Sequence, residues 1–324
     1  MIPRLVVRVD GSREVGFGHA VRSLALVQAW LDQGGTASVA SAYLPDPVRQ
    51  TLLDEGVQII GLPSVDTVTD PLLELFEQTD WAIFDSYVVP AQVRELAKER
   101  CPRTGMIDDF ANSTRPVNLD LIVDQNLGVG PECYSDDRVN SLLLGTRYAL
   151  LRRFFRSTAS PRRQTSDGRL QILFLTGGSR HPVVADAFRG VAGNLRRQGH
   201  HVIAVGGDLS APQFDFNDLP RVMIEADLAV SAAGSTCWEL AWSGVPTVAI
   251  PIADNQNRLA EVLASTGAAV SLDPRSRELQ RDLSHTIAEL VATPERRQEM
   301  AEVGRSLVDG LGTERVVTAM MDEI

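Results

Sequence analysis

The sequence predicts an α/β protein made of two domains, each with a parallel sheet covered by helices. Short β-branched runs alternate along the chain with segments of helical period, which is the pattern of such sheets. The length of 324 residues suits two domains of ordinary size. A composition of 44% hydrophobic and 23% charged residues is typical of a globular protein and excludes fibrous and disordered classes.

In the first half, short apolar runs bounded by turn residues indicate the strands. The expected strands are Arg4–Val9, Ala37–Ala42, Val57–Gly61, Trp81–Asp85, Gly105–Asp108 and Leu119–Asp124. A helix is expected from about His19 to Gln33, because apolar residues recur there at roughly helical spacing before a Gly-Gly pair.

The second half repeats the alternation. Its expected strands are Leu170–Leu175, His201–Gly206, Leu228–Ser231, Thr247–Pro251 and Ala269–Leu272. The expected helices end near Gln198, run near Thr236–Ser243 and Gln256–Ser265, and close the chain at Glu314–Ile324.

The domain prediction divides the chain at a segment rich in Arg, Ser, Thr and Pro. It assigns 1–156 to a first α/β domain, 157–168 to a linker and 169–324 to a second, with the option that the last helix packs back on the first. Two such Rossmann-type domains are expected to face a central cleft lined by the loops that follow their strands.

The net charge and the cysteine content exclude several classes of partner and bound metal. A net charge of −11 argues against nucleic acid and anionic membranes as partners. No apolar run reaches the length of a membrane span. The apolar stretch at the start of the chain is too short for a signal peptide and is interrupted by Arg8. The three cysteines are far apart and form no CxxC pair, so neither a disulfide framework nor a zinc site is expected. We therefore expect a cytoplasmic protein.

The loop after the first strand carries Gly16 and Gly18, but it is not a dinucleotide fingerprint. The third glycine position holds Val21, and the second strand does not end on an acidic residue, so NAD is not expected. The loop places His19 at the start of a helix, where it can act as a general base. The alternative is a structural or exposed histidine.

Three loops of the second half combine small or amide side chains with a following helix, which suits a nucleotide diphosphate. The expected ligand residues are Gly177, Gly178, Ser179, Gly234, Ser235, Thr236, Asn255 and Gln256, together with Gly16 and Gly18 of the first loop and Glu239 for ribose hydroxyls. Ser235 or Thr236 is expected to cap its helix. The alternatives are tight turns, helix caps and, for Glu239, a favourable charge near a helix N-terminus.

The chain contains no Asp-x-Asp triplet, Walker loop, G-x-S-x-G elbow or HExxH motif. We therefore expect no bound metal and no cofactor. The diphosphate charge would be balanced by helix termini and backbone amides instead.

The chain resembles a known family in a set of short segments that occur in order. These are RVDGSREVGFGHAVRSLAL, IFDSY, MIDDF, GTRYALLRRFF, TGGS and SAAGSTCWE…ADNQ. The family is that of the UDP-2,4-diacetamido-2,4,6-trideoxy-β-L-altropyranose hydrolases of pseudaminic acid synthesis, with their spore-coat polysaccharide relatives. The second half also looks like the nucleotide-binding domain of the lipid II N-acetylglucosaminyltransferases.

This resemblance implies a GT-B fold with UDP held by the second domain. It also implies that His19 is the base, that Tyr87 lies beside the cleft and that Glu239 binds ribose. Two residues depart from the family pattern: Ser86 replaces the histidine of its D-H-Y segment, and Arg180 replaces an aspartate after the Gly-Gly turn.

The function expected from these features is hydrolysis of a UDP-sugar at the anomeric C1–O bond, with inversion at C1. His19 would deprotonate water, Tyr87 would orient the water or sugar, and the products would be UDP and a free amino- or deoxy-sugar. One alternative is a glycosyltransferase that passes the sugar to an acceptor molecule. Another is a non-catalytic nucleotide-sugar sensor or scaffold.

Overall fold

The structure is a computed structural model that describes residues 2–11, 17–111, 118–135, 139–158, 168–177, 181–206 and 216–324. The chain divides into two compact units. The first unit comprises Met1–Ser12, His19–Arg156 and Gly310–Ile324, and the second comprises Arg13–Gly18 and Ser157–Asp309.

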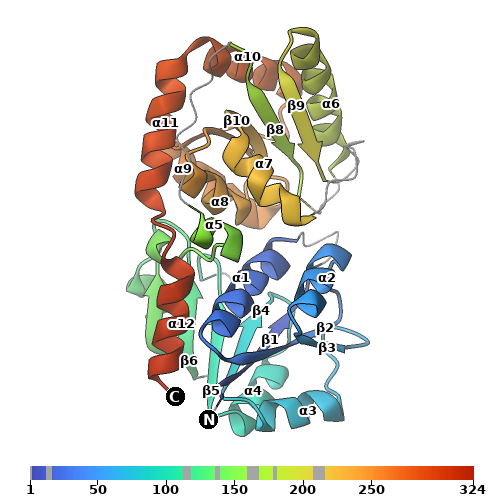
Figure 1. Ribbon diagram of the computed structural model, residues 1–324, viewed down its shortest axis with the longest axis vertical. Helices are drawn as coiled ribbons and strands as arrows, with labels where there is room; N and C mark the ends of the chain where they lie inside the picture. The colour runs from blue at the N-terminus through green and yellow to red at the C-terminus, as the bar shows by residue number, and fades with distance from the viewer. Residues whose placement is uncertain are drawn as a thin grey trace. The chain divides into compact units, whose positions relative to one another are not determined.

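The first unit contains a parallel sheet of seven strands in the order β3-β2-β1-β4-β5-β6-β7 (Figure 1). The strands are β1 (Arg4–Val9), β2 (Thr36–Ser41), β3 (Gln58–Gly61), β4 (Trp81–Asp85), β5 (Arg103–Ile107), β6 (Leu119–Asp124) and β7 (Val139–Leu144). The strand order reverses between β1 and β4, where Val9 pairs with Asp85. Open parallel sheets bind ligands at the carboxyl end of such a switch point.

Helices and short 3-10 turns connect these strands. They are α1 (Gly18–Asp32), α2 (Asp46–Asp54), α3 (Asp70–Glu77), α4 (Ala91–Arg100), η1 (Pro131–Tyr134), η2 (Thr146–Tyr148), α5 (Arg153–Ser157) and α12 (Gly312–Asp322). Most of α1 is buried, including Leu24, Leu26 and Trp30, because apolar residues lie on nearly every side of it. The start of this helix is therefore held firmly against the sheet.

The C-terminal helix α12 belongs to the first unit. The Trp81 indole donates to the backbone oxygen of Met320 at 2.9 Å, and the Leu151 N–H donates to Thr313 Oγ1 at 2.8 Å. Arg156 of α5 is largely buried and bridges Asp32 at 2.9 Å and Glu314 at 2.8 Å. The start of the arginine-rich segment is thus packed into the first unit by ion pairs. The region 159–167 lies outside the described residues.

Gly312 allows α12 to pack closely on the segment before α5. A Cβ at this position would lie 2.4 Å from the Ala149 oxygen and 2.5 Å from the Ala149 nitrogen, which are backbone atoms that cannot rotate away. Gly312→Ala is therefore expected to destabilise the first unit by about 1–3 kcal/mol, measured as a lower melting temperature. Gly61→Ala is the control, because a Cβ there meets no atom within 4 Å. An unchanged melting temperature for Gly312→Ala would contradict this packing.

The second unit contains a parallel sheet of five strands in the order β12-β11-β10-β8-β9. Its strands are β8 (Gln171–Leu175), β9 (His201–Val205), β10 (Leu228–Ala232), β11 (Thr247–Ile250) and β12 (Ala269–Ser271). Its helices and turns are α6 (Pro182–Arg197), η3 (Phe216–Asp218), α7 (Leu219–Glu225), α8 (Thr236–Ser243), η4 (Asp254–Gln256), α9 (Asn257–Thr266), α10 (Leu279–Ala292) and α11 (Pro294–Leu307). The order reverses between β8 and β10, so this sheet also has a switch point.

The two parallel-sheet domains confirm the predicted fold class. The expected strands agree with β1–β6 and β8–β12 to within one or two residues at each end. Strand β7 was not predicted; it is an edge strand whose one buried residue is Leu143. Asn140 is exposed and Ser141 is half-buried, and these polar residues weaken the apolar pattern that marks a buried strand.

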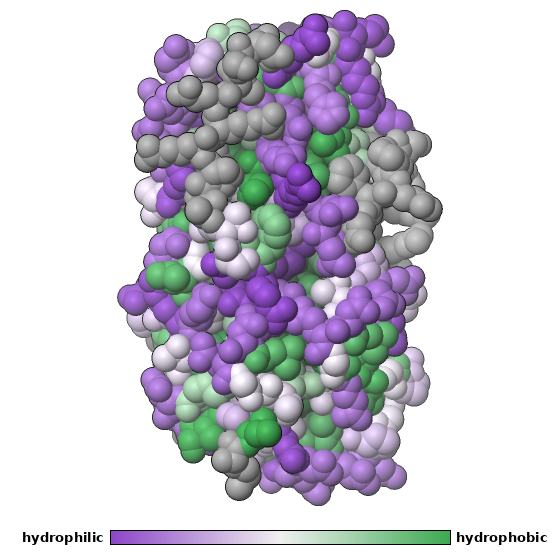
Figure 2. All heavy atoms as spheres, in the orientation of Figure 1, coloured by the Kyte–Doolittle hydropathy of each residue, from purple (hydrophilic) through white to green (hydrophobic). Residues whose placement is uncertain are grey.

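The face drawn in Figure 2 is mainly hydrophilic, with hydrophobic side chains in separate small groups. Among the described residues, no helix is both long and apolar enough to cross a membrane.

Candidate active site

Three neighbouring strands of the first unit end on aspartates. Asp85 is the last residue of β4, Asp108 and Asp109 follow β5, and Asp124 is the last residue of β6. Because the strands are parallel and adjacent, these carboxylates lie at the same edge of the sheet, next to the switch point.

The first turns of α1 bring three polar side chains to Asp85. His19, Arg22 and Ser23 are spaced three and four residues apart, which places them on one face of the helix. His19 Nδ1 lies 2.6 Å from Asp85 Oδ1, Arg22 donates through Nη2 at 2.7 Å and Nε at 2.9 Å, and Ser23 Oγ donates at 3.0 Å. Asp85 is fully buried, so its charge depends on these partners.

A second carboxylate, Asp109, lies on the other side of Arg22. Arg22 Nη1 is 2.8 Å from both oxygens of Asp109, and the Tyr87 hydroxyl also donates to this carboxylate. Asn126 Nδ2 donates to Asp109 Oδ1 at 2.7 Å and to Asp124 Oδ1 at 2.9 Å. Together, the contacts of Asp85 and Asp109 form one continuous network, which we call the Arg22 network.

Burial and charge act in opposite directions on these groups. Burial would raise the pKa of Asp85, but Arg22 and His19 outweigh it and hold that pKa below its usual range. The same competition leaves the pKa of Asp109 well below its usual range, mainly because of Arg22. Burial and the nearby charges of Asp109 and Asp108 raise the pKa of Asp124 to about 6.

These shifts predict how acid affects stability. The pKa of Asp109 is lower in the folded state than in the unfolded state, so its ion pair stabilises the fold above about pH 4 and loses this effect as the pH falls. Between about pH 6 and pH 3, the melting temperature should therefore fall more for the wild type than for Asp109→Asn. Asp273→Asn is the control, because its Arg275 pair is exposed. Equal falls for Asp109→Asn and the wild type would contradict this account.

The two ring nitrogens of His19 have different surroundings: Nδ1 is held by Asp85, whereas Nε2 has no hydrogen-bond partner among the described residues. Nε2 is buried, and the ring packs edge-on against Tyr87 with centroids 4.6 Å apart. Because Nδ1 faces the Asp85 carboxylate, the network assigns the proton to Nδ1 and leaves the lone pair on Nε2. A histidine so arranged can accept a proton from a bound molecule.

In the second unit, the turn after β8 is shaped by glycines. Gly177 has a φ of +62°, which favours glycine, and a Cβ on Gly206 would lie 2.5 Å from the Gly177 oxygen. Thr176 Oγ1 is buried and has no partner in the described ranges. Gly178, Ser179 and Arg180 lie outside the described residues, as does Gly16 of the first loop. Gly18 is the first residue of α1.

The loops after β10 and β11 meet in the second unit. Gln256 Oε1 accepts the Ile252 N–H at 2.9 Å, and a Cβ on Gly234 would lie 3.8 Å from Gln256 Nε2. Gly234 and Gln256, which the sequence analysis assigned to the same ligand, are therefore neighbours. Asn255 lies between Asp254 and Gln256 in η4.

The predicted side-chain cap of α8 is wrong. Ser235 occupies the N-cap position with helical angles (φ −55°, ψ −24°), and its side chain makes no capping bond. Capping by a serine side chain requires an extended N-cap residue. Thr236 is the first residue of α8, and Glu239 is nearly fully buried in the same turn. A role for Glu239 in ribose binding stays a prediction.

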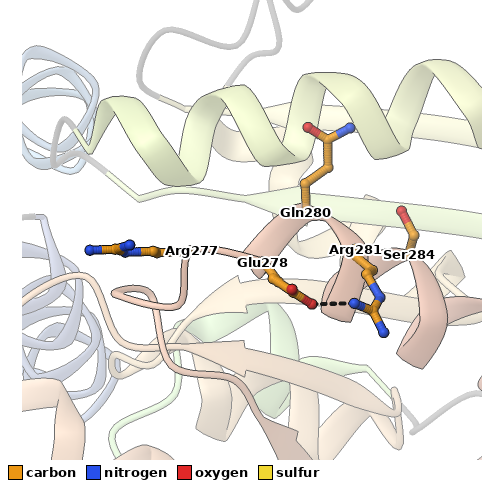
Figure 3. A pocket seen from close by; sticks show the side chains of 5 residues that line it. All are labelled: Arg277, Glu278, Gln280, Arg281 and Ser284. Carbon is orange, nitrogen blue, oxygen red and sulfur yellow. Dashed lines mark hydrogen bonds and ion pairs between the residues drawn. The ribbon is translucent and has the colours of Figure 1, made fainter.

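The second unit also has a cavity of about 420 Å³, whose lining residues come later in the chain than these loops. It is lined by Arg277, Glu278, Gln280, Arg281 and Ser284. Figure 3 shows Gln280 pointing toward α6, and a Cβ on Gly190 of that helix would lie 2.6 Å from Gln280 Nε2. Arg281 is paired with Glu278, and none of the predicted site residues lines this cavity.

His19 and Tyr87 were predicted from the sequence, but the residues that hold them were not. Asp85, Arg22 and Asp109 were not assigned a role, although two signals were available. One was the aspartate at the ends of three successive strands, and the other was the spacing of His19 and Arg22 on one helical face.

Comparison with known proteins supports the fold and the type of protein. Residues 161–309 match the family model of the glycosyltransferase family 28 C-terminal domain. The spore coat polysaccharide biosynthesis protein SpsG of Bacillus subtilis (strain 168) is 22% identical over 331 residues, which cover 97% of this chain and 96% of that protein. The expected resemblance to the spore-coat polysaccharide relatives is confirmed.

Two further comparisons involve transferases. The UDP-N-acetylglucosamine--N-acetylmuramyl-(pentapeptide) pyrophosphoryl-undecaprenol N-acetylglucosamine transferase of Xylella fastidiosa (strain Temecula1 / ATCC 700964) is 32% identical over 134 residues, or 40% of this chain and 37% of that protein. The crystal structure of Acinetobacter baumannii MurG covers 99% of both chains with a TM-score of 0.63 and 16% identity, which shows the GT-B fold. The chain therefore has a GT-B fold and a glycosyltransferase-like sequence, and its residues 161–309 match the glycosyltransferase family 28 C-terminal domain.

Proposed function

We propose that the protein hydrolyses a UDP-sugar at the anomeric C1–O bond, with inversion at C1, and releases UDP and a free amino- or deoxy-sugar. The observation that carries the proposal is the buried Nε2 of His19, which is free of partners within the described ranges, while Asp85 holds Nδ1. This is the arrangement of a general base, and such a base contributes roughly 10²–10⁴-fold to the rate.

In the proposed reaction, His19 Nε2 takes a proton from water as the water oxygen forms a bond to C1. The C1–O bond to the diphosphate breaks, and the electron pair leaves with UDP. Tyr87 donates its only hydroxyl proton to Asp109, so its oxygen can accept a hydrogen bond from the water or a sugar hydroxyl. Tyr87 would orient the attack in this way.

The second unit would bind UDP and stabilise the departing diphosphate. The glycine turn at Gly177, the neighbouring Gly234 and Gln256, and the start of α8 at Thr236 support this assignment. We propose that no metal ion takes part, because the sequence lacks an Asp-x-Asp motif and backbone amides can carry this charge. Gly178, Ser179, Asn255 and Glu239 complete the proposed nucleotide site.

The relatives suggest the setting of the reaction. SpsG is named for spore coat polysaccharide biosynthesis, and the Xylella transferase is named for a UDP-linked donor. We propose that this chain acts in the cytoplasm on a sugar intended for a surface polysaccharide, with pseudaminic acid synthesis as the setting implied by the resemblance.

The alternative is a transferase that passes the sugar to an acceptor molecule, and the match to a glycosyltransferase domain favours it. In that reaction His19 would deprotonate the acceptor in place of water. A panel of UDP-sugars, incubated with and without candidate acceptors, separates the two when UDP release and the sugar product are followed by NMR. Free sugar formed rapidly without acceptor supports hydrolysis. Turnover only with an acceptor supports transfer, and tight UDP binding without any turnover supports a sensor.

A further inference from the structure

We propose that Arg22 is the positioning residue of this site, because a single guanidinium fixes both the base and the tyrosine. The catalytic part of this inference rests on the proposed function. Arg22 itself is buried inside the first unit, at 3% exposure, and reaches the reaction only through two carboxylates.

The two carboxylates occupy different sides of the guanidinium. Nε and Nη2 of Arg22 donate to Asp85, whereas Nη1 donates to both oxygens of Asp109 at 2.8 Å. Nη2 also lies 3.4 Å from His19 Nδ1, so Arg22 and His19 converge on the same oxygen of Asp85. The position of Asp85 relative to His19 is thus set by Arg22 as well as by the strand.

Each carboxylate in turn holds one of the proposed catalytic side chains. Asp85 accepts from His19 Nδ1 and so directs Nε2, while Asp109 accepts the Tyr87 hydroxyl proton and so directs its oxygen. Since the His19 and Tyr87 rings touch each other, a shift at either carboxylate moves both of them. Arg22 therefore couples the orientation of the base to that of the tyrosine.

Only arginine can make this connection. Its planar fork offers five donors in a fixed geometry, whereas a lysine ammonium is a compact charge that cannot span two carboxylates in this way. Loss of the guanidinium would also leave the buried Asp85 and the partly buried Asp109 close together without their shared cation. Arg22→Lys keeps the charge and removes the geometry, which makes it the informative variant.

The test compares Arg22→Lys with Arg156→Lys. Arg156 is also largely buried and also bridges two carboxylates, Asp32 and Glu314, but it is not part of the Arg22 network. Imidazole nitrogen NMR follows His19, which His19→Asn identifies among the five histidines of the chain. Labelled tyrosine rings report on Tyr87, and unfolding temperature and UDP affinity report on the integrity of each variant.

We expect Arg22→Lys to shift the His19 and Tyr87 signals together and to lower kcat by about 10²-fold, the cost of a small misplacement of reacting groups. UDP affinity should be unchanged, and Arg156→Lys should leave both signals and kcat as in the wild type. Added methylguanidinium should restore part of kcat and both signals in Arg22→Ala.

Unchanged His19 and Tyr87 signals in a folded Arg22→Lys variant would overturn the inference, whatever the activity. A shift of only one of the two signals would also overturn it, because the claim is one of coupling. If both signals shift together but the wild type turns over no UDP-sugar, the proposed function fails and the coupling by Arg22 stands.

Discussion

Replacing Asp85 with asparagine is expected to lower kcat by about 10³–10⁴-fold, because the carboxylate that orients the catalytic histidine is lost. An asparagine amide can donate to His19 Nδ1, which favours the tautomer with its proton on Nε2. That nitrogen could then no longer accept a proton from water. The readout is kcat for the sugar that the wild type hydrolyses, with UDP affinity measured in parallel.

The control for this variant is Ser23→Ala. Ser23 donates to the other oxygen of Asp85 at 3.0 Å, so its removal weakens the support of the carboxylate without changing the charge or the tautomer. We expect a much smaller loss for Ser23→Ala than for Asp85→Asn. Losses of the same size in two folded variants would mean that Asp85 acts only through packing.

Replacing His19 with asparagine is expected to lower kcat by about 10²–10⁴-fold while UDP affinity stays unchanged. The asparagine amide can still donate to Asp85, so the buried carboxylate keeps a partner and the first unit should remain folded. What is lost is the only nitrogen assigned to take the proton. Near-normal turnover of His19→Asn would show that another group is the base.

The effects of His19→Asn and Asp85→Asn on kcat should not be additive. If His19 and Asp85 act as one unit, the double variant His19→Asn/Asp85→Asn should be about as slow as the slower single variant. A double variant slower by the product of both effects would mean that the two residues act independently.

Much of the fold could be predicted from local patterns. Buried parallel strands such as Trp81–Asp85 and Leu119–Asp124 are mainly apolar runs that end on an aspartate, so their predicted bounds agree with the structure. The edge strand β7 has a weaker pattern and was missed. The position of α12 in the first unit depends on contacts across the chain, such as Trp81 with Met320, which no local pattern encodes.

The sequence predicted the two proposed catalytic side chains, but not the residues that hold them in place. His19 stands out because it follows two glycines at the end of a strand, and Tyr87 was found through the family resemblance. In the local sequence, Arg22 looks like an ordinary helical arginine and Asp109 like a loop aspartate. Only the pairing order of β4, β5 and β6 brings Asp85, Asp109 and Asn126 to one edge of the sheet.

In the proposed reaction, water attacks C1 of the sugar while His19 accepts its proton. The most direct test is a single turnover of the UDP-sugar in water enriched in oxygen-18, with both products weighed by mass spectrometry before the free sugar exchanges its anomeric oxygen. Cleavage of C1–O predicts heavy oxygen in the sugar and unlabelled UDP. Heavy oxygen in the phosphate of UDP would show cleavage at phosphorus and rule out attack of water at C1.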